Sequence, residues 1–199
     1  MKCLIMFLVL ALAGCASPLN ERNAHNYADQ GAAAQQAGDW DVARRCWAKV
    51  VVNAQLAGMT DEEQAIAFYE YGRSCGVTCF YEKSEKYLLK ALALDRASGG
   101  PVHMSLLELA RLNFDQGKYQ IANHYFGQLT AIYARARAAE KDPAGVALVY
   151  EEFSKSLANV NKHDEAKKYR RMSEQLKRKA RGRKSDTERT PYGKHCSKN

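Results

Sequence analysis

The side chains that could support catalysis are scattered along this sequence of 199 residues. Five histidines stand at positions 25, 103, 124, 163 and 195, with no HExxH motif and no carboxylate at metal-ligand spacing. Two carboxylate pairs, Glu62-Glu63 and Glu151-Glu152, are interpreted as helix starts, where the helix dipole favours acidic side chains. No GxSxG, Walker A or GxGxxG motif occurs in the sequence. We therefore predict a protein that is not an enzyme, with no catalytic residues, no metal site and no cofactor.

Four cysteines lie beyond the N-terminal segment: Cys46, Cys75, Cys79 and Cys196. They form no CxxC motif and no histidine stands near them in a metal-binding spacing. Cys75 and Cys79 are separated by four positions across an expected turn, so an oxidising compartment could join them. Cys46 and Cys75 also fall on expected helix faces, where cysteine serves as a small buried hydrophobe. We favour this second interpretation.

The N-terminal segment has the composition of a targeting sequence. Lys2 precedes an apolar run from Leu4 to Ala13, which is shorter than the roughly 20 residues that a membrane-spanning helix needs. The run ends in Leu12-Ala13-Gly14-Cys15, which resembles the lipobox of bacterial lipoproteins. The alternative is an ordinary secretory leader followed by a chance cysteine.

The lipobox resemblance implies that residues 1–14 are a signal peptide removed before Cys15, which then carries several acyl chains. One acyl chain anchors a protein only marginally, whereas several make the anchor effectively permanent. In the lipoproteins of Gram-negative bacteria, Asp beside the lipidated Cys retains the protein at the inner membrane, and here that residue is Ala16. The resemblance therefore implies the periplasmic face of the outer membrane, with residues 15–21 as the lipidated cysteine and a short tether.

One short stretch recurs and organises the rest of the chain. Gly38-Asp39-Trp40-Asp41-Val42-Ala43 returns in related form at residues 79–84, 117–122 and 161–166. Each copy lies between two helix-like segments, so each predicts the turn of a helical hairpin. A small residue stands 12 positions before the end of each copy, at 31, 72, 110 and 154, and lets paired helices approach closely. A large apolar residue stands four positions after the first three copies, at 47, 88 and 126.

This pattern resembles the tetratricopeptide repeat (TPR) over residues 22–181. The resemblance implies an all-α, right-handed solenoid of about four helical hairpins. Arg170 and Ser173 stand in the fourth unit where the others have apolar residues, which is typical of a polar terminal cap. The turns are spaced by 41, 38 and 44 residues, longer than the usual period of about 34, so we expect longer helices or loops.

We expect helices over about residues 22–37, 40–57, 61–76, 81–98, 101–116, 119–140, 143–160 and 163–181. Thr60 with Glu63 predicts a capping box at one helix start. Asp142-Pro143 predicts another start, with Asp as the N-cap and Pro in the first turn.

A binding groove is the site that this architecture predicts. The first helix of each hairpin lines a concave surface, and the residues just after the small positions point into it. Three of these are cations, with apolar or aromatic side chains nearby; the predicted groove residues are Tyr69, Arg73, Leu107, Arg111, Phe114 and Lys155. Such a set suits an extended peptide with a carboxylate, which arginine holds with two parallel hydrogen bonds. The alternative is that the three cations are merely solvated.

The positive charge of the chain is concentrated at its C-terminal end. From Lys177 onward nine Lys and Arg residues face two acidic residues, whereas the net charge of the whole chain is +8. The polar composition after Gly182, with Pro191 and Gly193, predicts that residues 182–199 form a basic disordered tail. We expect no nucleic-acid partner, because the leader directs the chain out of the cytoplasm. Anionic lipids and wall polymers are the polyanions that such a tail would meet there.

The sequence thus favours a membrane-anchored TPR scaffold that binds other proteins of the cell envelope. Small lipoproteins of this kind assist pilus, secretion or outer-membrane assembly, which the resemblance implies and the residues do not specify. The alternative is a polyanion-binding or membrane-surface-binding protein that acts through its basic tail. A weaker alternative is an accessory to a cell-wall enzyme. Groove binding should survive moderate salt, whereas tail binding should weaken steeply.

Overall fold

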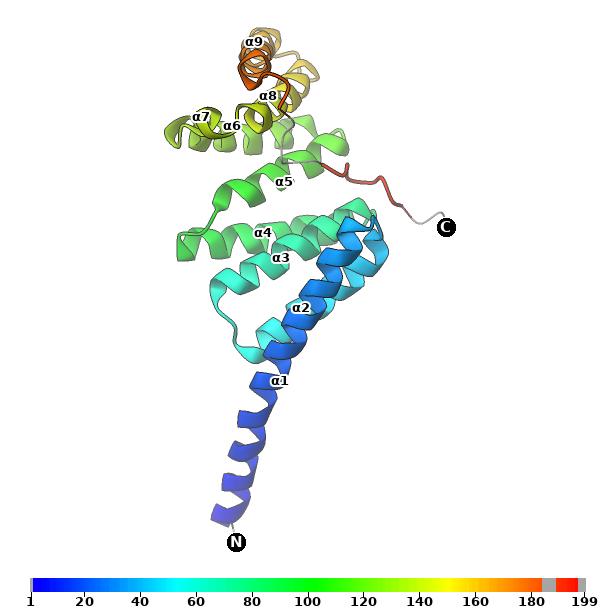
Figure 1. The fold of residues 1–199 in the computed structure, drawn as a ribbon, viewed down its shortest axis with the longest axis vertical. Coiled ribbons are helices and arrows are strands. Elements are labelled where there is room, and N and C mark those ends of the chain that lie inside the picture. Colours follow the sequence, from blue (N-terminus) through cyan, green and yellow to red (C-terminus); the bar gives the residue numbers. More distant parts are fainter. Residues whose placement is uncertain (1, 184–188, 197–199) are drawn as a thin grey trace. The chain divides into compact units, whose positions relative to one another are not determined.

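Helices make up most of the described part of the chain (Figure 1). The computed structural model describes residues 2–183 and 189–196, with side chains from residue 18 onward. Two compact units are present: unit 1 is Met1–Val102 with Gly193–Asn199, and unit 2 is His103–Tyr192. Within the residues described, no helix is long and apolar enough to cross a membrane.

Unit 1 consists of two helical hairpins. Its helices are α1 (Lys2–Gln36), α2 (Trp40–Ala57), α3 (Asp61–Val77) and α4 (Tyr81–Ser98). α1 pairs with α2, α3 pairs with α4, and α2 packs against α3 (Figure 1). The buried core includes Trp47, Phe68 and Tyr71, each less than 9% exposed.

Unit 2 contains the remaining five helices of the described chain. They are α5 (Val102–Asp115), α6 (Tyr119–Arg135), α7 (Ala138–Lys141), α8 (Pro143–Ala158) and α9 (His163–Ala180). α8 pairs with α9, and α6 packs against α8. Phe126 of α6 is fully buried and stacks on Phe153 of α8, with ring centroids 5.4 Å apart.

The expected helices are found with two differences. Arg137 takes a left-handed conformation with φ of 50°, so the helix expected over 119–140 is divided into α6 and the four-residue α7. α1 begins at Lys2, so it runs through the predicted leader and tether. The side chain of Cys15 lies outside the described residues, and the leader and lipidation stay predictions.

The four recurring turns share a backbone feature that confirms their alignment. Their first residues, Gly38, Cys79, Gly117 and Asn161, have φ of 78°, 71°, 71° and 62°. Glycine takes this left-handed conformation freely and asparagine tolerates it, whereas other residues lose roughly 1–2 kcal/mol. The second turn is therefore unusual, because a cysteine occupies the position.

The small residues before the turns lie where the paired helices are closest. A Cβ atom added to Gly72 would lie 2.9 Å from Cγ of Leu88, and one added to Gly31 would lie 2.8 Å from Nε1 of Trp47. Trp47 and Leu88 are buried. These large residues thus pack on the glycine of their own hairpin, so neither glycine can gain a side chain unless the facing residue shifts.

The predicted caps are present, but Ser173 has a different role from the one expected. The Thr60 side chain accepts from the Glu63 N–H while Glu63 accepts from the Thr60 N–H, and Asp142 accepts from the Gly145 N–H at 2.8 Å. Ser173 is 2% exposed and donates to the Ala147 carbonyl at 2.7 Å, so it does not belong to a polar outer face. Seven residues after the turn, a side chain faces its own partner helix; Arg170 is exposed as expected of a cap.

A disulfide joins Cys79 to Cys196, with Cα atoms 5.3 Å apart, and both residues belong to unit 1. The possible Cys75–Cys79 bridge is therefore wrong, since Cys75 is free and fully buried. Burial raises the pKa of the Cys75 thiol to about 11, so it stays protonated at neutral pH. The interpretation of Cys46 and Cys75 as buried hydrophobes is confirmed.

The disulfide is part of an ordered C-terminal segment. The Gly193 N–H donates to the Gly76 carbonyl and the His195 N–H to the Val77 carbonyl, both at 3.0 Å. The prediction of disorder is therefore wrong for residues 189–196, because partners far away in the sequence hold them. Residues 182 and 183 follow α9, where the Arg183 N–H donates to the Ala180 carbonyl at 3.0 Å, and the rest of that prediction, at 184–188 and 197–199, lies outside the described residues.

Replacing Cys196 with Ser should lower the free energy of unfolding by about 2–4 kcal/mol, because the bridge closes a long loop in the unfolded chain. On that background, Cys79→Gly should raise it by about 0.5–1 kcal/mol, because glycine takes the left-handed conformation without a Cβ penalty. Asn161→Gly, at the equivalent position, is the matched control and should change little. Urea denaturation measures all three; further destabilisation by Cys79→Gly would contradict the prediction.

Candidate functional site

Two of the predicted groove residues, Tyr69 and Arg73, lie together on α3 in unit 1. The Arg73 guanidinium lies 5.7 Å from the Tyr69 ring centroid, and its Nη1 is 3.2 Å from the Glu70 carboxylate. Gln35 of α1 donates to the same carboxylate at 2.8 Å. The Arg73 side chain is 24% exposed, so it is accessible, but Glu70 already balances its charge. Glu70 is not among the residues that the repeat pattern predicts for the groove.

Arg111 of α5 is the centre of a buried charge cluster in unit 2. Arg111 is 3% exposed. Its Nε donates to Glu152 at 2.9 Å, and its Nη1 lies 3.4 Å from Glu108. Burial alone would lower the pKa of Arg111, but the carboxylates of Glu152 and Glu108 outweigh it and hold the pKa above its usual value. A partner's carboxylate would therefore find this arginine enclosed and already paired.

The other predicted groove residues of unit 2 divide into buried and exposed ones. Leu107 is 8% exposed, and the Phe114 ring contacts the rings of Tyr119 and Phe126 edge-on. Lys155 is exposed and donates to Glu151 at 2.6 Å. Hydrogen bonds from Lys155 and Lys177 lower the pKa of Glu151.

The groove itself stays a prediction. Tyr69 and Arg73 belong to unit 1, and the other four residues belong to unit 2. The pair Glu151-Glu152 lies within α8 (Pro143–Ala158) and not at its first turn, so its interpretation as a helix-start pair is wrong. These two carboxylates serve ion pairs instead.

The C-terminal segment adds two side chains to the cluster around Arg111. The Tyr192 hydroxyl donates to Glu108 at 2.6 Å, and the Tyr192 N–H donates to Asp115 at 2.9 Å. Arg189 donates to Asp115 from both terminal nitrogens, one of them at 3.0 Å, and its Nε is 3.2 Å from Glu152. Tyr192 is 7% exposed.

Three carboxylates, Glu108, Asp115 and Glu152, thus surround two arginines, Arg111 and Arg189. We call this set with Tyr192 the carboxylate cluster. Sequence reasoning found Arg111 alone, because the contacts of Arg189 and Tyr192 span 74 and 84 residues of sequence. The cluster can bind a cation and a hydroxyl donor.

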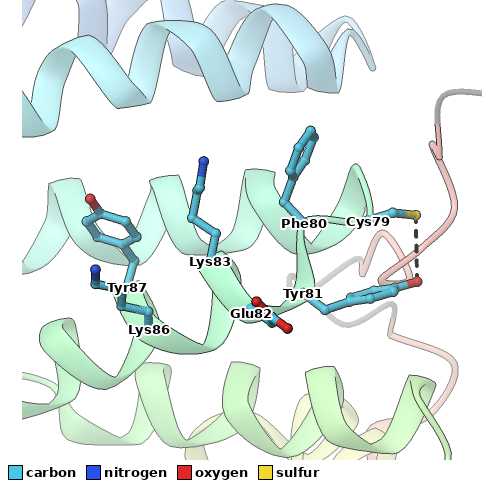
Figure 2. A pocket seen from close by; sticks show the side chains of 7 residues that line it. All are labelled: Cys79, Phe80, Tyr81, Glu82, Lys83, Lys86 and Tyr87. Carbon is cyan, nitrogen blue, oxygen red and sulfur yellow. Dashed lines mark hydrogen bonds between the residues drawn. The ribbon is translucent and has the colours of Figure 1, made fainter.

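A cavity of about 550 Å³ opens at the start of α4 in unit 1. It is lined by Cys79, Phe80, Tyr81, Glu82, Lys83, Lys86 and Tyr87. Figure 2 shows the Tyr81 hydroxyl beside the Cys79 sulfur, at 3.6 Å, and Phe80 and Lys83 projecting from another side of the helix. The Arg44 guanidinium lies 4.3 Å from the Phe80 ring centroid, so cations and aromatic rings dominate this surface.

Among the residues that the structure describes, no group of three His, Cys, Asp or Glu side chains could hold a metal ion. The absence of a metal site, of a cofactor and of catalytic residues stays a prediction.

Arg111→Met should lower the free energy of unfolding by about 3–5 kcal/mol, because it leaves the buried carboxylates without their cation. Arg73→Met is the matched control and should lower it by about 1 kcal/mol, because that ion pair is partly solvated. Urea denaturation of the two purified variants measures the difference. Equal losses would show that Arg111 is no more dependent on its partners than a surface arginine.

Comparison with known proteins relates the chain to solved structures only. No protein-family model matches the sequence, and no curated protein matches it. BtubC (BKLC) from P. vanneervenii has a TM-score of 0.70 at 15% identity, over 89% of this chain and 68% of that one. MamA has a TM-score of 0.64 at 16% identity, over 86% of this chain and 88% of that one.

A third similar structure is described as a protein with TPR-like repeats. It is a Podosopora anserina protein described as a kinesin light chain with nearly identical TPR-like repeats, with a TM-score of 0.61 at 18% identity, over 79% of this chain and 77% of that one. At such low identities the likeness concerns the fold. The chain has the all-α fold of a TPR-like solenoid, as its repeated turns predict.

Proposed function

We propose that the chain is a non-enzymatic, lipid-anchored adaptor of the cell envelope that binds a protein partner through the inner surfaces of its helical hairpins. The observation that carries the proposal is the TPR-like arrangement of helical hairpins, in which α3 of unit 1 leaves Tyr69 and Arg73 accessible. Such surfaces bind extended peptides through spaced polar and aromatic side chains. Tyr69 and Arg73 provide one such pair, with the arginine 24% exposed.

Two independent features support a location outside the cytoplasm. The leader ends in Leu12-Ala13-Gly14-Cys15, which fits lipidation of Cys15. Cys79 and Cys196 form a disulfide, and structural disulfides persist mainly in oxidising compartments. Ala16 beside Cys15 favours the outer membrane, with the folded part in the periplasm.

The alternative that relies on the basic tail has less support. Among the described residues from Lys177 onward, Lys177 pairs with Glu151 and Arg189 pairs with Asp115, both carboxylates of unit 2. Cations that are already paired contribute less to binding a polyanion than free ones.

Cys15→Ser should abolish the lipid anchor when the chain is expressed in a Gram-negative host. The wild-type chain should incorporate radiolabelled palmitate and sediment with outer membranes, because several acyl chains hold a protein at the bilayer. The variant should incorporate none and remain in the soluble or unprocessed fraction. Cys3→Ser, in the leader, is the control. Labelling of the Cys15→Ser chain would contradict the anchor.

A photo-reactive residue at position 69 should crosslink an envelope protein in intact cells, because the proposed binding surface includes Tyr69 and Arg73. The matched control is position 89, where Leu89 is 41% exposed on α4, the second helix of the same hairpin. The crosslink should persist in moderate salt if apolar contacts dominate. Equal crosslinking at both positions would contradict binding through the inner face.

A further inference from the structure

The carboxylate cluster of unit 2 has the features of a binding site that the chain itself fills. Its floor is rigid, because Arg111 is 3% exposed and Glu108 is 8% exposed. Its contacts with residues 189–192 involve two side chains and one backbone N–H, with a phenol and a guanidinium three positions apart. Extended peptides are recognised in this way, through spaced side chains and main-chain hydrogen bonds.

The excess of carboxylates in the cluster favours a ligand with a cationic side chain. Without Arg189, the cluster would hold three carboxylates and one arginine, so it would carry an excess of negative charge. Arg189 supplies the missing cation and reaches Asp115 with both terminal nitrogens, a geometry that arginine offers and lysine does not. The Tyr192 hydroxyl satisfies Glu108.

Residues 189–192 have the properties of a replaceable ligand. Residues 189–192 contain no helix, and their side-chain contacts are to carboxylates of α5 and α8. Pro191 disfavours the helical conformation at Thr190, which limits the conformations of the free segment.

We propose that Glu108, Asp115 and Glu152 form a recognition site for an extended peptide with Arg and, three residues later, Tyr, and that Arg189–Tyr192 occupies this site in cis. The segment acts as a cover that excludes a partner's peptide of the same chemistry. This inference rests on the proposed binding function, since it names the chemistry of the partner, but it requires neither the lipid anchor nor the inner face of unit 1.

The cover has the advantage of being intramolecular. A tethered segment has an effective concentration of about millimolar, so a free peptide at micromolar concentration competes poorly.

The test uses the full-length oxidised chain and a fluorescein-labelled peptide with the sequence of residues 189–194. Fluorescence anisotropy should detect at least about tenfold tighter binding to the double variant Arg189→Ala, Tyr192→Ala than to the wild type, because only the variant leaves the site open. Circular dichroism checks that both chains are equally helical.

The peptide and the site are then varied separately on the open chain. A peptide with Ala in place of Arg should bind at least about tenfold more weakly, because it loses the charge-assisted contacts. Glu152→Gln in the open chain should weaken binding similarly, whereas Glu174→Gln, on an exposed residue of α9, should not.

Three outcomes would overturn the proposal. The first is no binding by the folded open chain at millimolar peptide, and the second is equal binding by the wild type. The third comes from the single variant Arg189→Ala, which keeps Tyr192 and serves even if the double variant does not fold. This variant should bind the peptide at least about threefold more tightly than the wild type. Unchanged binding would contradict the proposal that residues 189–192 cover the site. A negative result in these peptide-binding experiments does not change the result expected from photo-crosslinking at position 69. The proposed peptide site and the proposed binding function can therefore be rejected independently.

Discussion

The close approach of paired helices is the constraint on which the rest of the structure depends. At Gly72 the facing Leu88 leaves no room for a Cβ atom, and at Gly31 the Trp47 ring does the same. This contact sets the rotation of α3 in its hairpin, since the face that carries Gly72 must point to α4. Tyr69 and Arg73 are then left on a different face, with Arg73 24% exposed. A packing requirement thus determines which side chains are available for binding.

In unit 2 the corresponding face carries a charge that packing alone would not tolerate. Arg111 is nearly inaccessible, and a buried cation is stable only when carboxylates and hydrogen bonds replace its water. Glu108 and Glu152 do so, but they leave carboxylate oxygens that need further donors. The Tyr192 hydroxyl donates to Glu108, and the Arg189 guanidinium lies 3.2 Å from Glu152 as an ion pair. The ordering of the C-terminal segment is therefore a consequence of burying Arg111.

Sequence reasoning succeeded where the determining contacts are local. The repeated turns and the Thr60–Glu63 capping box involve residues within about one helical turn, and the repeat made the turns visible four times. It failed where the partner is distant. Nothing near Arg189 or Cys196 indicates Asp115 or Cys79, which lie 74 and 117 residues away. A polar composition predicts disorder only in the absence of such partners.

The left-handed backbone conformation of Cys79 and its disulfide both bear on the proposed location of the protein. The equivalent positions of the other three turns hold Gly38, Gly117 and Asn161, residues that suit a left-handed backbone. A cysteine is less stable there by roughly 1 kcal/mol, so its presence needs a compensating interaction, which the bond to Cys196 provides. That bond is useful only where thiols are oxidised. The leader and the strained turn are separate features of the sequence, and both favour a protein that acts in the envelope.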